Sequence, residues 1–239
     1  MGAGTAQRII PLSIRTVADM ANQLDLQEQE QLDEFKAFWK QYGNAITWVV
    51  TIALLAFAGW NGWNWWQREQ AAKAGALFEV LDTAAQAGDA AKTSQVFDDL
   101  KERHPRTVFA QQAGLLAAKV QYQAGAVDRA QAILGWVADK GSEDEYRTLA
   151  RLRLAGVLMD AKKYDEALKQ LDAATSPSFA ALVADRRGDV LLAQGKREEA
   201  KAAFAASYKG LDERLEFRKI VEAKLTALGV APAASGAAP

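Results

Sequence analysis

The side chains that could do chemistry in this chain are few and lie far apart in the sequence. Its one histidine, His104, stands before Pro105 at the end of a predicted helix, and the chain contains no cysteine. A histidine that acts as a general base needs a positioned partner, and no second histidine or cysteine exists to serve as one. We therefore interpret His104 as a loop residue, and we expect neither thiolate chemistry nor disulfides.

Two acidic clusters have an ordinary structural explanation. Glu143, Asp144 and Glu145 stand at the start of a predicted helix, where the helix dipole favours negative charge. Glu198 and Glu199 lie at another junction of a turn and a helix, where such side chains are normally solvated. The sequence has no glycine-rich phosphate loop, paired-carboxylate motif or metal-ligand spacing. It thus predicts no enzyme: no catalytic, cofactor-binding or metal-binding residues, no cofactor and no small-molecule substrate.

Four arginines on predicted helices are the candidate partner-binding residues: Arg147, Arg151, Arg186 and Arg187. A guanidinium group can grip a carboxylate of a partner protein through two parallel hydrogen bonds. The alternative is a solvated or salt-bridged helix face, which is common on protein surfaces. The sequence leaves both interpretations open.

The composition predicts a helical chain with a packed core and no affinity for nucleic acid. Half of the 239 residues are apolar, and the formal net charge is −1, so no basic field would attract a polyanion. Alanine is abundant, whereas proline and runs of β-branched residues are scarce, which favours helix over sheet. The predicted fold class is therefore all-α.

One segment is long and apolar enough to cross a membrane. No residue from Tyr42 to Trp66 is charged, and as a helix this stretch is roughly 37 Å long against a hydrocarbon core of about 30 Å. The aromatic residues expected to anchor it at the two interfaces are Trp39, Tyr42 and Trp48 at one end and Trp60, Trp63, Trp65 and Trp66 at the other. The alternatives are a buried helix of a soluble protein and a cleaved signal peptide, for which the small residues 72–76 offer cleavage sites.

Charge alone does not orient this transmembrane helix. Lys36 and Lys40 precede it and Arg68 and Lys73 follow it, a tie under the positive-inside rule. The segment ahead is short, so a signal-anchor arrangement would keep it in the cytoplasm and translocate the long C-terminal part.

Five segments follow from these patterns. We expect residues 1–19 to be a disordered, non-native start, with Met20 as the natural one, and residues 20–43 to form a cytoplasmic amphipathic helix that ends at a break near Gly43 and Asn44. Residues 44–66 form the transmembrane helix, and residues 67–229 form a domain of helix pairs. Residues 230–239 are rich in Ala, Pro, Gly and Ser, a composition that predicts a disordered tail.

The C-terminal domain contains a repeated pattern of a turn, an alanine and a large apolar residue one helical turn later. The aligned alanines are Ala130, Ala167 and Ala200, 37 and 33 residues apart, and each is followed by Leu134, Leu171 or Phe204. Two antiparallel helices approach closely only where a small side chain lies at their crossing. In the third unit we expect Gly188 to be that small residue on the first helix. The period and pattern are typical of tetratricopeptide repeats, which stack into an α-solenoid with a concave binding surface.

Three features follow one another in this sequence. They are the run of residues 29–43, the transmembrane segment that ends in Gly59-Trp60-Asn61-Gly62-Trp63, and the degenerate repeats. In this respect the chain resembles the YfgM-like family of ancillary Sec-translocon subunits, over about Met20 to Leu228. The resemblance implies a single-pass protein of the bacterial inner membrane with a cytoplasmic N-terminus and periplasmic repeats. It also implies contacts with the SecYEG translocon and with periplasmic chaperones.

These observations favour a non-enzymatic, membrane-anchored adaptor that associates with the Sec translocon. Its repeat domain would bind periplasmic chaperones or exported polypeptides. The alternative hypothesis is a structural scaffold of another cell-envelope complex that uses the same repeats.

Overall fold

The computed structural model describes the backbone of residues 13–230 and the side chains of residues 31–230. Every regular element within these residues is a helix and none is a strand, which confirms the predicted all-α class. The chain divides into two compact units, Met1–Trp65 and Trp66–Pro239, which we describe separately.

The described part of the first unit is the leading part of α1 (Ser13–Gln86), a single helix of 74 residues. The break expected at Gly43 and Asn44 is not found, because α1 continues through both residues. The ring of Trp39 covers Gly43, where a Cβ atom would lie 3.1 Å from the indole, and the Thr47 hydroxyl donates to the Gly43 carbonyl at 2.7 Å. One glycine costs a helix only about 1 kcal/mol, so favourable neighbours carry the helix past it.

The predicted segments at the two ends of the chain lie largely outside the described residues. Residues 1–12 and 231–239 are not described, and α1 already begins at Ser13, inside the segment 1–19 that the sequence suggested was disordered. The choice of Met20 as the natural start therefore stays a prediction.

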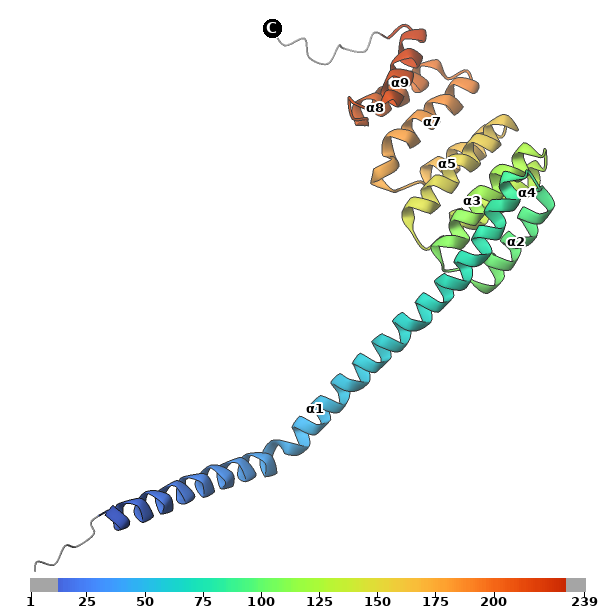
Figure 1. The fold of residues 1–239 in the computed structure, drawn as a ribbon. Helices are drawn as coiled ribbons and strands as arrows, with labels where there is room; N and C mark the ends of the chain where they lie inside the picture. The colour runs from blue at the N-terminus through green and yellow to red at the C-terminus, as the bar shows by residue number, and fades with distance from the viewer. Residues whose placement is uncertain (1–12, 231–239) are drawn as a thin grey trace, which may run out of the picture. The chain divides into compact units, whose positions relative to one another are not determined.

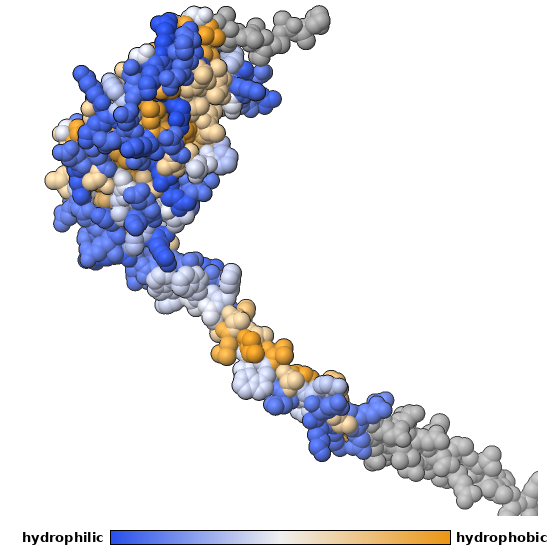
Figure 2. All heavy atoms as spheres, turned by 180° about the vertical axis from the view of Figure 1, so that it is seen from behind, coloured by the Kyte–Doolittle hydropathy of each residue, from blue (hydrophilic) through white to orange (hydrophobic). Residues whose placement is uncertain are grey.

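The membrane-spanning candidate is an exposed apolar band on α1. Among helices with described side chains, residues 31–86 alone are long and apolar enough to cross a membrane, by length and composition. Figure 2 shows this band with a more polar surface ahead of it. Its large side chains are exposed, among them Ile52, Leu55 and Phe57. The core helix of a soluble protein would bury such side chains, so the exposure disfavours that alternative.

The second unit is a stack of helices that follow one another in chain order (Figure 1). After the end of α1 come α2 (Ala90–Arg103), α3 (Val108–Gln123), α4 (Val127–Lys140), α5 (Asp144–Asp160), α6 (Tyr164–Asp172), a short 3₁₀ turn η1 (Pro177–Phe179), α7 (Ala180–Ala193), α8 (Arg197–Gly210) and α9 (Glu216–Ala227). Helices adjacent in the chain pack together, and α5 also contacts both α3 and α7. The first helices of successive pairs thus form one continuous layer.

The turn inside each helix pair uses a residue with positive φ. Gly88, Gly125 and Gly195 have φ between 70° and 80°, and Lys162 takes the equivalent place with φ 60°. In each case the residue after it donates a backbone hydrogen bond five residues back, as Lys163 does to Leu158 at 2.8 Å. This is the Schellman arrangement, which normally requires glycine because a Cβ atom is crowded at positive φ. Lys162 is therefore a strained position in an otherwise uniform turn.

The helices of each pair cross where one side chain is small, as the repeat pattern predicts. Ala130, Ala167 and Ala200 are completely buried, and Leu134, Leu171 and Phe204 are at most 2% exposed. A Cβ atom added to Gly188 would lie 2.5 Å from the Phe204 ring, and one added to Gly114 would overlap Val137. The expectation for Gly188 is thus confirmed.

The core of the second unit has two parts. The larger cluster runs from Ala74 of α1 to Val190 of α7, and a smaller one joins Phe204 of α8 to Val221 and Leu225 of α9. Leu168 packs against both clusters. The last helices therefore pack around a small core of their own.

A partly buried ion pair attaches α9 to α7. The Lys224 ammonium donates to both carboxylate oxygens of Asp185, at 2.8 and 2.9 Å, and to Asp189 at 2.8 Å. The same nitrogen lies 5.0 Å from the centre of the Phe204 ring. Burial raises the pKa of Asp185 above its ordinary value, although Lys224 opposes this effect. A buried carboxylate of this kind is tolerated because its cation lies in contact with it.

Gly188→Ala should destabilise the repeat domain. The added methyl group must displace the Phe204 ring, and overpacking of this kind typically costs about 1–3 kcal/mol. Gly135→Ala is the matched control, because Gly135 is also helical and has no atom within 4 Å of an added Cβ. Urea unfolding of the full chain in mild detergent, followed by circular dichroism, measures both free energies. Equal stabilities of the two variants would contradict the packing described for Gly188.

Lys162→Gly should stabilise the same domain by about 1 kcal/mol, because glycine adopts positive φ without the steric cost that lysine bears. The control is Lys163→Gly, since the neighbouring lysine has φ −87° and gains nothing from glycine. Thermal unfolding distinguishes the two changes. A lower melting temperature for Lys162→Gly than for the native chain would show that the turn is not strained.

Candidate interaction surface

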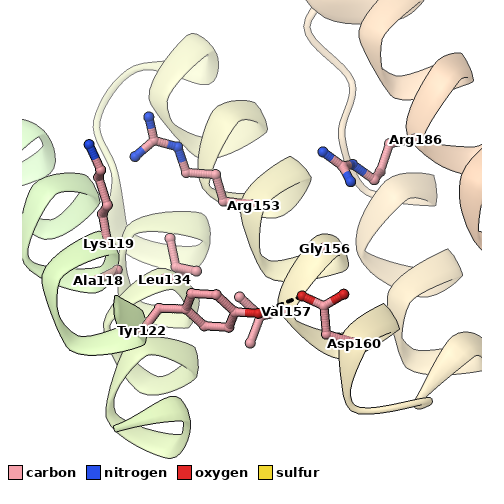
Figure 3. A pocket seen from close by; sticks show the side chains of 9 residues that line it. All are labelled: Ala118, Lys119, Tyr122, Leu134, Arg153, Gly156, Val157, Asp160 and Arg186. Atoms are coloured by element: carbon pink, nitrogen blue, oxygen red, sulfur yellow. Dashed lines mark hydrogen bonds between the residues drawn. The ribbon is translucent and has the colours of Figure 1, made fainter. Parts of the chain in front are cut away.

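A hollow in the second unit lies across the layer of first helices. Its volume is about 350 Å³, and it opens widely to solvent. The lining residues come from α3, α4, α5 and α7: Ala118, Lys119, Tyr122, Leu134, Arg153, Gly156, Val157, Asp160 and Arg186 (Figure 3). Because three successive helix pairs contribute to it, its shape depends on how the repeats stack.

The charged groups of the hollow are mostly cationic. Lys119, Arg153 and Arg186 supply three positive charges, against the one carboxylate of Asp160. Arg153 donates from Nη1 to the carbonyl oxygen of Leu115 at 3.1 Å, which links α5 to α3. The Arg153 residue as a whole is exposed, but partial burial of its guanidinium lowers its pKa. Arginine still keeps its charge, since its ordinary pKa lies far above neutrality.

The carboxylate of the hollow already has a partner. The Tyr122 hydroxyl donates to Asp160 at 2.6 Å, between α3 and α5 (Figure 3). This hydrogen bond raises the pKa of Tyr122, because the neutral phenol is the form that can donate. Asp160 forms no ion pair with any of the three cations among the described residues.

Arg186 extends from α7 toward α5 over a position that has no side chain (Figure 3). A Cβ atom on Gly156 would lie 3.7 Å from Arg186 Nη1. The nearest carboxylate oxygen to this guanidinium belongs to Asp189, at 3.9 Å, and Asp189 also accepts from Lys224 at 2.8 Å. Arg186 is thus only weakly paired.

The four arginines singled out in the sequence do not form one site. Arg147 donates to the Gly141 carbonyl at 2.8 Å and to Asp144, and Arg187 donates to Asp172 at 2.6 Å. Arg151 donates to the carbonyl oxygens of Ala138 and Ala173, which join the ends of α4 and α6 to α5. Only Arg186 lines the hollow. Partner binding by the other three stays a prediction, and their present contacts connect parts of the repeat domain.

Sequence reasoning missed Lys119, Tyr122, Arg153 and Asp160 as residues of the hollow. One pattern could have revealed part of the set: Arg153 and Arg186 are 33 residues apart, the same separation as Ala167 and Ala200. They therefore occupy the same position in successive repeats. Arg151, which the sequence pattern suggested instead, is two residues from Arg153 and lies on a different face of α5.

His104 and the acidic clusters have structural surroundings. His104 Nδ1 lies 2.5 Å from the side-chain oxygen of Gln70, and burial, followed by Lys73 and Arg103, lowers its pKa. Glu198 accepts from Lys201 at 2.8 Å. Among residues 31–230 no group of three or more His, Cys, Asp or Glu side chains is arranged to hold a metal ion.

The aromatic residues proposed as membrane anchors all lie on α1 with exposed rings. The exposed fraction is 69% for Trp60 and 63% for Trp48, and Trp39, Tyr42, Trp63, Trp65 and Trp66 are also exposed. Phe35 stacks on Trp39, and Phe38 packs against Tyr42, so the aromatic surface continues ahead of the apolar band.

A helix able to span a membrane, stacked helix pairs and a hollow across their first helices together define a tetratricopeptide repeat-like protein with a candidate membrane anchor. The family model for the tetratricopeptide repeat-like domain matches residues 36–230. A relative from Neisseria gonorrhoeae, named an ancillary SecYEG translocon subunit, is 31% identical over 204 residues, which cover 85% of this chain and 98% of the relative.

Two further relatives carry the same name. The Escherichia coli protein is 27% identical over 76% of this chain and 87% of its own length, and the Haemophilus influenzae protein is 26% identical over 75% and 87%. The chain belongs to this YfgM-like family of ancillary SecYEG translocon subunits, which confirms the resemblance seen in the sequence. The candidate apolar helix fits an inner-membrane anchor.

Arg151→Met should lower the stability of the repeat domain by about 2 kcal/mol, because hydrogen bonds from a charged donor to two helix-end carbonyls are lost. Lys169→Met is the control, since Lys169 is exposed on α6 and forms no ion pair among the described residues. Chemical unfolding of the full chain measures the difference. An Arg151→Met protein of unchanged stability would favour a role in partner binding instead.

Proposed function

We propose that this chain is a non-enzymatic adaptor that associates with the SecYEG translocon in the bacterial inner membrane. Its repeat domain lies in the periplasm and binds chaperones or exported polypeptides there. The observation that carries this proposal is the combination of family membership with a hollow across three helix pairs. Stacked helix pairs commonly use such a surface to bind peptides or proteins.

The apolar part of α1 serves in this proposal as an uncleaved anchor. The family model begins at residue 36, so it matches the apolar band and the repeats as one unit. An anchor confines the repeat domain to the membrane surface near the translocon. Such tethering raises the effective concentration of a weakly binding surface without any new contact.

The adaptor role can be tested by photocrosslinking in native membranes. A photoreactive residue at Val50, which is exposed in the apolar band, should crosslink to SecY, SecE or SecG. The same residue at Tyr122, at the edge of the hollow, should crosslink to chaperones or exported polypeptides. Glu199 is the control position, because it is exposed on α8 outside the hollow.

Two results would contradict the proposal. Crosslinks to cell-envelope assembly proteins alone, identified by mass spectrometry, would favour a structural scaffold. The orientation is read in the same membranes from single-cysteine variants at Gln31 and Glu199, which report without interference because the chain has no cysteine of its own. Labelling of the Gln31 position by an impermeant maleimide in intact cells would reverse the proposed topology.

A further inference from the structure

We propose that the hollow across α3, α5 and α7 binds an acidic, extended segment of a polypeptide, with successive Asp or Glu side chains of that segment facing Lys119, Arg153 and Arg186. This inference rests on the proposed function, because it names the chemistry of the partner that the repeat domain holds.

The first argument is the charge of the hollow. Three cationic side chains face one carboxylate, and that carboxylate is engaged by Tyr122. The protein as a whole has a net charge of −1, so the positive charge is local to this surface. A concave surface with one sign of charge concentrates ligands of the opposite sign.

The second argument is that these cations lack strong partners. Lys119 and Arg153 form no ion pair among the described residues, and the carboxylate beside Arg186 is 3.9 Å away. By contrast, Arg147 and Arg187 pair closely with Asp144 and Asp172. The hollow thus holds cations that are free to meet carboxylates, whereas the arginines outside it are already engaged.

The third argument is the register of the repeats. Arg153 and Arg186 take equivalent positions on α5 and α7, so their charges repeat with the helix pairs. Packed helices lie about 8–10 Å apart, and α5 contacts both α3 and α7. An extended polyproline II segment advances about 3.1 Å per residue with three residues per turn, so every third side chain lies on one face about 9 Å from the last. A segment with acidic residues at every third position therefore matches the spacing.

The fourth argument is access. Gly156 leaves the wall of α5 without a side chain beneath Arg186, and the hollow is open to solvent rather than enclosed. An extended chain can lie across such a surface without any rearrangement of the helices. A small molecule with a single carboxylate would leave two of the three cations without a partner.

The test uses the full chain in nanodiscs of a neutral phosphatidylcholine and fluorescent peptides read by anisotropy. One peptide has Glu at every third position in an Ala-Pro background, and its matched forms carry Gln or Lys instead. The Glu peptide should bind, and it should bind more weakly at high salt because exposed charge pairs are screened. The Gln and Lys peptides should bind at least tenfold more weakly.

The decisive variant is Lys119→Glu with Arg186→Glu, which reverses two charges and leaves the Arg153 hydrogen bond to Leu115 in place. This variant should bind the Glu peptide about tenfold or more weakly than the native chain does. It should bind the Lys peptide more tightly than the native chain does. Lys140→Glu with Lys169→Glu is the control, because it makes the same change in net charge at exposed positions outside the hollow. This control should change the affinity less than about twofold, since surface charges at a distance contribute little.

Equal binding of the Glu and Gln peptides, absence of binding by the Glu peptide, or an equal effect of the control variant would overturn the inference. If the reversed variant gains binding of the Lys peptide, it is folded. Its lost binding of the Glu peptide then cannot be attributed to unfolding. The proposed function fails separately: it falls if crosslinks in membranes never reach the translocon or export proteins, whatever the peptides do.

Discussion

The repeat domain depends on the close crossing of paired helices, where a residue without a bulky side chain faces a large apolar one. Gly188 against Phe204 is the tightest of these crossings with a ring, and the buried alanines 130, 167 and 200 serve the same purpose along the stack. Close approach removes apolar surface from water and leaves no room for a further methyl group. The spacing of the helices, and with it the shape of every surface built on them, follows from this constraint.

The hollow is one consequence of that constraint. Each first helix directs its small and apolar residues toward its partner, so other positions on α3, α5 and α7 remain available to line a surface. Equivalent positions then recur in space, as Arg153 and Arg186 show. Arg151, only two residues from Arg153, points elsewhere and binds helix-end carbonyls. On α5, therefore, Arg151 joins neighbouring helices, whereas Arg153 lines the open surface.

The sequence predicted a domain of helix pairs because local chemistry marks the ends of several of its helices. Gly88, Gly125 and Gly195 stop helices at positive φ, and Pro177 ends the connection before α7. The break expected at Gly43 was wrong, because α1 continues through this residue and one glycine costs a helix only about 1 kcal/mol. The sequence did not predict most of the residues that line the hollow. Its lining depends on which face each helix turns toward the others, and this is decided by how the helices stack. Only the 33-residue spacing of Arg153 and Arg186 carried that information in the sequence.

The C-terminal end of the solenoid, formed by α8 and α9, packs around a smaller core than the rest of the repeat domain. Stability in a stack of repeats is a sum over neighbours, and the terminal unit has a neighbour on one side only. Here that unit is held by Leu168, by the Lys224 contacts and by a cluster smaller than the main core. Loss of the Lys224 contacts would therefore weaken the attachment of α9 to α7 and leave the larger core between α1 and α7 intact.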